Sequence, residues 1–221
     1  MKKILYVGPS WAYRSYDTVE GSETEYTNLL TELELSAVNL SQPGLSNTAC
    51  LDLVNQYEGQ FDAILWVYCE VIADCLHENK QNLIESENFW ELRNAINQKT
   101  LTMINQIGCP VGLIGAHSDI VDCDQKNITV IHPSWQKFLA NQCAIDLEHG
   151  WGAEVAHRYA MYEFKKSKPS KTMIDFTSNT LQAWTQMELL GVWRGVHPNK
   201  NGNELFAKEI KNSVQDFINN L

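Results

Sequence analysis

The chain has 221 residues, of which 44% are hydrophobic and 20% are charged, and its formal net charge at pH 7 is −10. This length and composition predict one globular domain, residues 1–221, with a substantial buried core, and they exclude a disordered or fibrous protein. The negative charge argues against nucleic acid and against an anionic membrane as partners, because both repel an acidic surface.

The start of the chain does not have the pattern of a signal peptide. Met1-Lys2-Lys3 is followed by the apolar run Ile4–Val7, which is too short for such a peptide and ends at Gly8-Pro9. Nothing later in the sequence approaches the length of a membrane span. The six cysteines lack CxxC spacing, and a chain of this size does not need a disulfide framework. We therefore expect a cytoplasmic protein with reduced thiols.

Short apolar runs predict strands that are buried on both faces of a sheet. In chain order these runs are Ile4–Val7, Ala37–Leu40, Ala63–Tyr68, Val111–Ile114 and Ile128–Ile131. Few hairpin signals separate them, and helical patterns lie between and after them. This alternation predicts a parallel sheet enclosed by layers of helices.

The predicted helices follow from apolar residues at helical spacing. In chain order they are Ser22–Leu33, Asn47–Tyr57, Glu87–Ile107, Trp151–Phe164, Leu181–Leu190 and Gly202–Leu221. Asn47 or Thr48 is a suitable N-cap for the second of these helices. In the long helix Glu87–Ile107, the spacing places these apolar residues on the buried side: Trp90, Leu92, Ile96, Leu101, Ile104 and Ile107.

Several candidate residues follow the predicted strands directly. Ser10 follows the first strand, Gly44 the second and Glu70 the third. Because parallel sheets bind ligands at the carboxyl ends of their strands, we expect these residues to share one site. His197 precedes the last helix, and a serine and a histidine that converge are the minimum for a base-activated nucleophile.

Each of these residues also has an ordinary structural interpretation. Ser10 could cap a turn, and His197 could bond a backbone carbonyl beside Pro198. Gly44 could be a turn glycine after Pro43, and Glu70 could be a solvated loop residue.

Other histidines fit a site less well. His117-Ser118-Asp119 follows the fourth strand, but adjacent residues do not generally face one another, so we expect His117 or Asp119 to line the cleft at most. Ser134, after His132-Pro133, is predicted to cap the next helix. His149 and His157 lack further ligands at the spacing of a metal site.

The order of these segments resembles the SGNH (GDSL-type) hydrolase superfamily. Gly8-Pro9-Ser10 matches the Gly-Asp-Ser block after the first strand, and Gly44 matches the glycine of the second block. His197-Pro198 and Gly202 match the block before the last helix. The resemblance implies a flavodoxin-like three-layer α/β/α domain with about five parallel strands. It also implies cleavage of acyl or acetyl esters, on small molecules or carbohydrates, by Ser10 and His197 without a cofactor or metal.

Three positions depart from the superfamily's pattern. Arg194 stands where the acidic triad member lies, three residues before the histidine, and Pro9 replaces the aspartate of the first block. Tyr68-Cys69-Glu70 lacks the asparagine that the third block supplies after strand three. Loss of one oxyanion donor costs about 10²–10³ in rate. Loss of the acid costs about 10⁴ in a triad enzyme.

The resemblance and its departures leave two interpretations open. In the first, Ser10 and Gly44 amides hold the oxyanion with Asn47 as a substitute donor, and Trp11, Glu70 and Arg194 form the rim of the site. In the second, the chain is a catalytically degenerate member of the superfamily that keeps the fold as a binding or structural module, including one associated with a virion.

Overall fold

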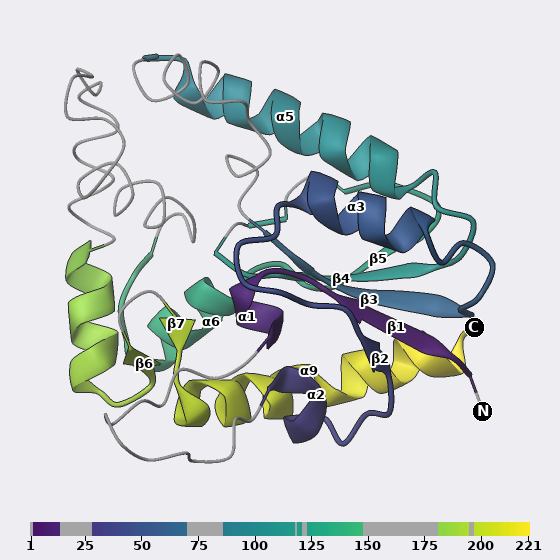
Figure 1. Cartoon of the computed structure of the whole chain (residues 1–221). Coiled ribbons are helices and arrows are strands. Elements are labelled where there is room, and N and C mark those ends of the chain that lie inside the picture. Colours follow the sequence, from purple (N-terminus) through teal and green to yellow (C-terminus); the bar gives the residue numbers. More distant parts are fainter. Residues whose placement is uncertain are drawn as a thin grey trace.

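The central sheet consists of five parallel strands in the order β2-β1-β3-β4-β5 (Figure 1). The computed structural model describes residues 2–13, 28–69, 86–117, 119–120, 123–147, 181–194 and 197–221. The strands are β1 (Ile4–Val7), β2 (Val38–Asn39), β3 (Ala63–Tyr68), β4 (Val111–Gly115) and β5 (Ile128–His132). Each predicted strand forms with ends within one residue of the expected ones. The order is the flavodoxin-like one, so the predicted fold class is confirmed.

Helices cover both faces of this sheet (Figure 1). On one face lie α3 (Asn47–Asn55) and α5 (Phe89–Ile104), and on the other lie α2 (Leu29–Glu32), α6 (Trp135–Gln142) and α9 (Lys200–Asn219). The side chains of β1 alternate between two cores. Ile4 and Tyr6 pack on the α9 side, whereas Leu5 and Val7 pack on the side of α3 and α5. The three central strands β1, β3 and β4 are therefore buried on both faces, as the uninterrupted apolar runs indicated. The expectation is wrong for the edge strand β2, where Val38 is 49% exposed, and β5 at the other edge is buried only in part, because each edge strand has a neighbour on one side only.

The helices begin and end near their predicted limits where they can be compared. Ser46, rather than Asn47 or Thr48, caps α3, because its Oγ accepts a hydrogen bond from the Ala49 amide at 3.2 Å. Residues 181–189 are helical, and α9 starts two residues earlier than predicted, at Lys200. The helix predicted at Trp151–Phe164 and the start of the one at Ser22–Leu33 lie outside the described residues.

The expected buried side of α5 is wrong at Leu92, although Ile96 packs against the core as expected. Leu92 is 44% exposed, whereas Arg93 and Asn97 are buried. Polar partners from neighbouring segments explain the difference. The Arg93 Nη2 donates to the Asp119 carbonyl at 3.2 Å, and the Tyr68 hydroxyl donates to Asn97 Oδ1 at 2.9 Å. Apolar spacing alone cannot predict such partners, although Leu101 and Ile104 in the second half are buried as expected.

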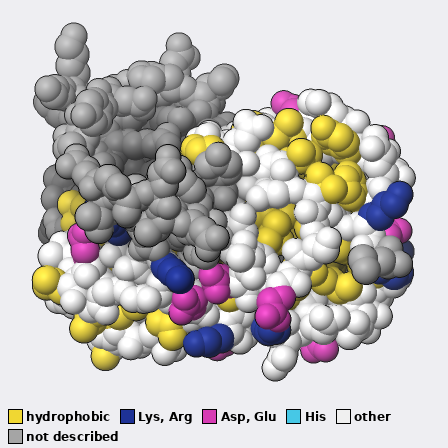
Figure 2. Space-filling view, turned by 60° about the horizontal axis from the view of Figure 1, so that its bottom comes forward, with side chains coloured by type: hydrophobic (Ala, Val, Ile, Leu, Met, Phe, Trp, Pro, Cys, Tyr) yellow, Lys and Arg dark blue, Asp and Glu magenta, His cyan; other side chains and the backbone are white. Residues whose placement is uncertain are grey.

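The outer face of α9 and its neighbours carries charges of both signs (Figure 2). One such pair joins Lys211 of α9 to Glu34, just after α2, with 3.0 Å between Nζ and Oε2. The inner face of α9 buries Phe206, Ile210 and Val214 against the sheet. In the part of the chain that the structure describes, no helix has the length and apolar character needed to cross a bilayer.

Candidate active site

Ser10 and His197 meet at the carboxyl edge of the sheet. The Ser10 Oγ lies 2.7 Å from the His197 Nε2, although the two residues are 187 positions apart in sequence. Ser10 opens the short helix α1 (Ser10–Tyr13), which follows β1, and His197 begins β7 (His197–Pro198). Both side chains are partly buried. The distance is that of a hydrogen bond between a nucleophile and its general base.

A close approach of backbone segments fixes the position of Ser10. Gly8 leaves β1 against β3, and a Cβ at this position would lie 2.8 Å from the Val67 Cβ and 2.9 Å from the Val67 carbonyl oxygen. Real side chains do not tolerate such contacts, so only glycine fits. The Ala12 amide then donates to the Pro9 carbonyl at 2.9 Å and closes the turn that presents Ser10. The segment Gly8-Pro9-Ser10 therefore needs a glycine at its first position for packing alone, whether or not Ser10 is a nucleophile.

A small hairpin carries His197. Strand β6 (Trp193–Arg194) pairs antiparallel with β7, so that Trp193 is opposite Pro198 and Arg194 is opposite His197. Residues directly opposite in such a pair place their side chains on the same face. Trp193 and Pro198 are buried, and Arg194 and His197 share the other face. The hairpin thus turns the imidazole toward Ser10 and away from the core.

The start of α9 anchors this hairpin from behind. Asn199 caps the helix by accepting from the Gly202 amide at 3.0 Å, and its Nδ2 donates to the Gly191 carbonyl at 2.9 Å. Gly202 packs so closely on the Val192 carbonyl oxygen that a Cβ would collide with it. The glycine of the last block is therefore also a packing requirement. Asn199 is a positioning residue that the sequence analysis missed, although an asparagine just before a helix is a recognised N-cap signal.

Aromatic side chains form the floor beneath the Ser10–His197 pair. Trp11 is only 2% exposed, and its ring centroid lies 4.2 Å from that of His117, 5.2 Å from Trp193 and 6.2 Å from His197. Trp135 adds a further edge-to-face contact to Trp11 at 5.5 Å. Trp11 thus lies below the pair rather than at a solvent-exposed rim. These ring contacts form a buried aromatic cluster on one side of the His197 imidazole.

The loop after β2 lies beside the turn that carries Ser10. The Gln42 amide donates to the Gly8 carbonyl at 3.1 Å, which joins the two loops directly. Gly44 in this loop has a φ of +79°, in the left-handed region that favours glycine. The structure therefore brings the loop of the second block next to the first block, as the shared sheet edge predicts.

Asn47 makes a two-point contact with the end of β3. Its Nδ2 donates to the Cys69 carbonyl at 3.2 Å, and its Oδ1 accepts from the Cys69 amide at 2.9 Å. The side chain is 1% exposed. It therefore pairs with a peptide group as a neighbouring strand would, and it ties the loop after β2 to the segment after β3. Glu70, the next residue, lies outside the described residues.

Arg194 lies three residues before His197, at the position where the superfamily pattern described above has an acidic residue. Its side chain is exposed, on the hairpin face that also carries His197. No ion pair joins the Arg194 guanidinium to any of the described residues. A positive charge here cannot stabilise an imidazolium as a carboxylate would.

The remaining described candidates, Ser134, His132 and Asp119, make contacts within the fold. Ser134 caps α6 as predicted, since its Oγ accepts from the Lys137 amide at 3.2 Å. His132 Nδ1 accepts from the Ser134 amide at 3.2 Å, and burial lowers the pKa of His132 against the opposing charges of Glu209 and Asp119. The Asp119 carboxylate lies 3.6 Å from the Lys137 Nζ.

Across the described ranges, no three His, Cys, Asp or Glu side chains are grouped as metal ligands, and His149 and His157 fall outside those ranges.

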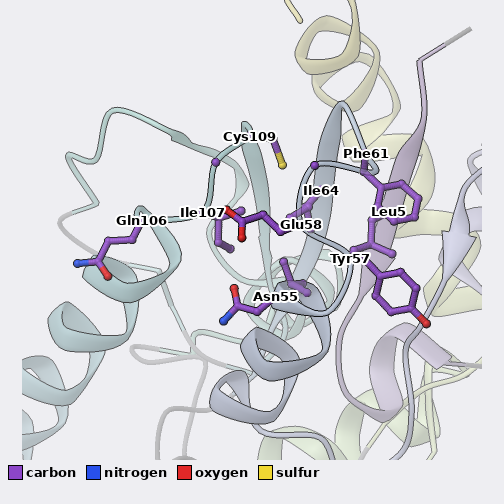
Figure 3. Close-up of a pocket in the computed structure, with 12 residues that line it drawn as sticks. Leu5, Asn55, Tyr57, Glu58, Phe61, Ile64, Gln106, Ile107 and Cys109 are labelled. Atoms are coloured by element: carbon purple, nitrogen blue, oxygen red, sulfur yellow. The ribbon is translucent and has the colours of Figure 1, made fainter.

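A separate hollow lies at the opposite, amino edge of the sheet (Figure 3). It encloses about 190 Å³ between the ends of α3 and α5 and the starts of β1, β3 and β4. Its polar lining includes Asn55, Glu58 and Gln106, and the Cys109 thiol also faces it. Burial, and then the charge of Asp62, raises the pKa of Cys109, so the thiol stays protonated. Among the described residues no histidine lines this hollow, and the one carboxylate in its lining is that of Glu58.

Comparisons of this chain with known proteins found similarity to solved structures and none to family models or curated sequences. No protein-family model and no curated protein matches the sequence. Among solved structures, the chain is similar to the protein YxiM from Bacillus subtilis, with a TM-score of 0.45 and 14% identity over 98% of this chain. It spans 57% of the length of that protein. It is also similar to a lipase/acylhydrolase from Enterococcus faecalis, with a TM-score of 0.43, 12% identity, and coverage of 98% of this chain and 96% of that one.

Proposed function

We propose that the chain is an ester hydrolase in which Ser10 is the nucleophile and His197 is the general base. The observation that carries this proposal is the 2.7 Å contact between the Ser10 Oγ and the His197 Nε2. Two residues so distant in sequence meet only because a glycine turn and a hairpin present them to each other.

The reaction follows from this geometry. His197 Nε2 takes the hydroxyl proton as Ser10 Oγ attacks the acyl carbonyl, which forms a tetrahedral intermediate with a negative oxygen. The intermediate collapses, the ester C–O bond breaks, and the imidazolium returns its proton to the leaving alkoxide. Water, deprotonated by His197, then attacks the acyl-Ser10 ester, and the acid and free Ser10 are released.

Backbone amides are the proposed oxyanion donors. The Ser10 amide stands at the first position of α1, where helical geometry leaves an N–H without an intrahelical acceptor. The Gly44 amide lies in the loop that the Gln42–Gly8 hydrogen bond joins to the same turn. Asn47, with its amide on the Cys69 peptide, contributes by holding this loop against β3.

Arg194 stands three residues before His197, where the superfamily pattern has its acid, and we expect this substitution to limit the rate. In a triad enzyme the acidic residue orients the imidazole and stabilises its charged form, and its loss costs about 10⁴ in rate. Here the hairpin and the Trp11 floor orient the ring, but Arg194 adds a like charge. We therefore expect slow turnover of small acyl esters, including acetyl esters of carbohydrates.

A serine-directed fluorophosphonate probe tests the proposal on the whole chain. The wild-type protein should be labelled at Ser10, as located by peptide mass spectrometry, and should hydrolyse 4-nitrophenyl acetate. Ser10→Ala and His197→Gln should lose both labelling and turnover while keeping the wild-type circular dichroism spectrum. A folded wild-type protein that is neither labelled nor active would instead support the binding or structural module.

A further inference from the structure

The exposed face of the β6–β7 hairpin combines the general base with one cation. Cross-strand pairing sets Arg194 directly opposite His197. Opposite residues in an antiparallel pair have Cβ atoms about 4.5–5.5 Å apart, so the guanidinium can reach past the imidazole toward whatever Ser10 attacks. Trp193 and Pro198 on the other face are buried, and they fix which way the hairpin faces.

The Arg194 guanidinium forms no ion pair with any of the described residues. Lys211 pairs with Glu34 and Lys137 lies near Asp119, but no described carboxylate pairs with Arg194. The chain as a whole has a net charge of −10. An exposed arginine beside the base, in so acidic a protein, is suited to an anionic group that arrives with the substrate.

We propose that Arg194 selects esters whose alcohol portion carries a carboxylate or a similar anionic group. The proposal rests on the hydrolase function proposed above. His197 must return a proton to the leaving oxygen, so the alcohol portion of the ester lies on the His197 side of Ser10. An anion on that portion meets Arg194, and it offsets the positive charge that the guanidinium places beside the imidazolium.

Two acetate esters test this selectivity. One is 4-acetoxybenzoate, whose alcohol portion is anionic, and the other is 4-acetoxybenzamide, which has a similar shape and no charge. Both leave the same acetyl group on Ser10, so their deacylation steps are identical. The measured quantity is the ratio of their kcat/KM values, each divided by the ester's rate of hydrolysis by hydroxide. This ratio isolates recognition of the charge in the acylation step.

In the wild-type protein the ratio should favour the anionic ester by up to about fivefold, the upper end of the range for an exposed ion pair. It should decrease as salt is added, because ions screen an exposed pair. Arg194→Gln should bring the ratio to about one, and Arg194→Lys should keep part of the preference. Lys208→Gln, an equal change of charge at an exposed position of α9, should leave the ratio unchanged.

Failure of this proposal is distinct from failure of the hydrolase function. If the wild-type protein hydrolyses both esters with a ratio near one, or if Arg194→Gln retains the preference, Arg194 does not select the substrate although the chain is an esterase. If Lys208→Gln lowers the ratio as much as Arg194→Gln, the effect is one of overall charge, and the assignment to Arg194 is overturned. Absence of turnover and of Ser10 labelling would overturn both proposals together.

Discussion

The two edges of the central sheet both expose a potential nucleophile, but they differ in what surrounds it. At the carboxyl edge Ser10 meets His197 at 2.7 Å over a buried aromatic floor. At the amino edge Cys109 faces a hollow of about 190 Å³, yet burial raises its pKa, and none of the described residues that line the hollow is a histidine. The comparison teaches that a cavity alone does not make an active site. A base must converge on the nucleophile, and parallel topology favours this at the carboxyl edge.

The largest expected effect is on activity, which should depend on residues at the carboxyl edge of the sheet and not on Cys109 at the amino edge. Ser10→Ala and His197→Gln should each lower kcat/KM for 4-nitrophenyl acetate by about 10³–10⁴ or more, because the two residues act as one unit. For the same reason the double variant should be no worse than either single variant. Cys109→Ser at the other edge should leave kcat/KM unchanged. Additive losses from Ser10 and His197 would show that the pair does not work together.

A smaller effect concerns stability at the two edges. Alanine normally suits a helix better than glycine, but at Gly202 its Cβ would collide with the Val192 carbonyl oxygen. Gly202→Ala should therefore lower the free energy of unfolding, measured in urea, by about 3 kcal/mol. Gly59→Ala, at the amino edge, should cost about 1 kcal/mol, because its φ of +73° is strained for alanine but no atom lies within 4 Å of its Cβ. Equal losses would contradict this contrast.

Two asparagines on α3 provide a matched test of the contact with β3. Asn47→Ala leaves the buried Cys69 amide and carbonyl without these hydrogen bonds, and should cost about 2–3 kcal/mol in unfolding free energy. It should also slow turnover, since the loop after β2 loses its tie to the site. Asn55→Ala, at the exposed amino end of the sheet, should change stability by less than about 0.5 kcal/mol. A small loss for Asn47→Ala with unchanged turnover would remove its positioning role.

The smallest effect concerns pH and distinguishes His132 from the histidine of the site. Burial lowers the pKa of His132 in the folded protein from the usual value of 6.5, against the opposing charges of Glu209 and Asp119. The unfolded chain therefore binds the proton more readily, so stability is highest above about pH 6.5 and falls as the pH decreases. The urea midpoint should drop less between pH 7.5 and 5.5 in His132→Asn than in the wild-type protein. Equal drops would mean that His132 contributes nothing to the pH dependence.

The predictions from sequence were accurate where local pattern sets the outcome. Continuous apolar runs predicted all five strands of the sheet, and for the central strands β1, β3 and β4 the reason is that a strand buried on both faces admits few polar residues. The same runs did not reveal that the edge strand β2 is exposed. The prediction was wrong at Leu92 of α5, which is exposed, whereas its neighbours Arg93 and Asn97 are buried. The polar groups that make this burial possible, Tyr68 and the Asp119 carbonyl, come from distant segments, so no local pattern could reveal them.

The same distinction applies to the candidate site, part of which follows from the sequence and part only from the tertiary structure. The sequence alone determined the order of strands and helices, and with it the sheet edge to which Ser10 and Gly44 belong, because successive strands of a parallel sheet end at the same edge. Only the tertiary structure decided that His197 reaches Ser10, that Asn47 pairs with Cys69 and that Arg194 shares the face of the base. These contacts depend on side-chain direction across segments far apart in the chain, and spacing along the sequence carries no information on that direction.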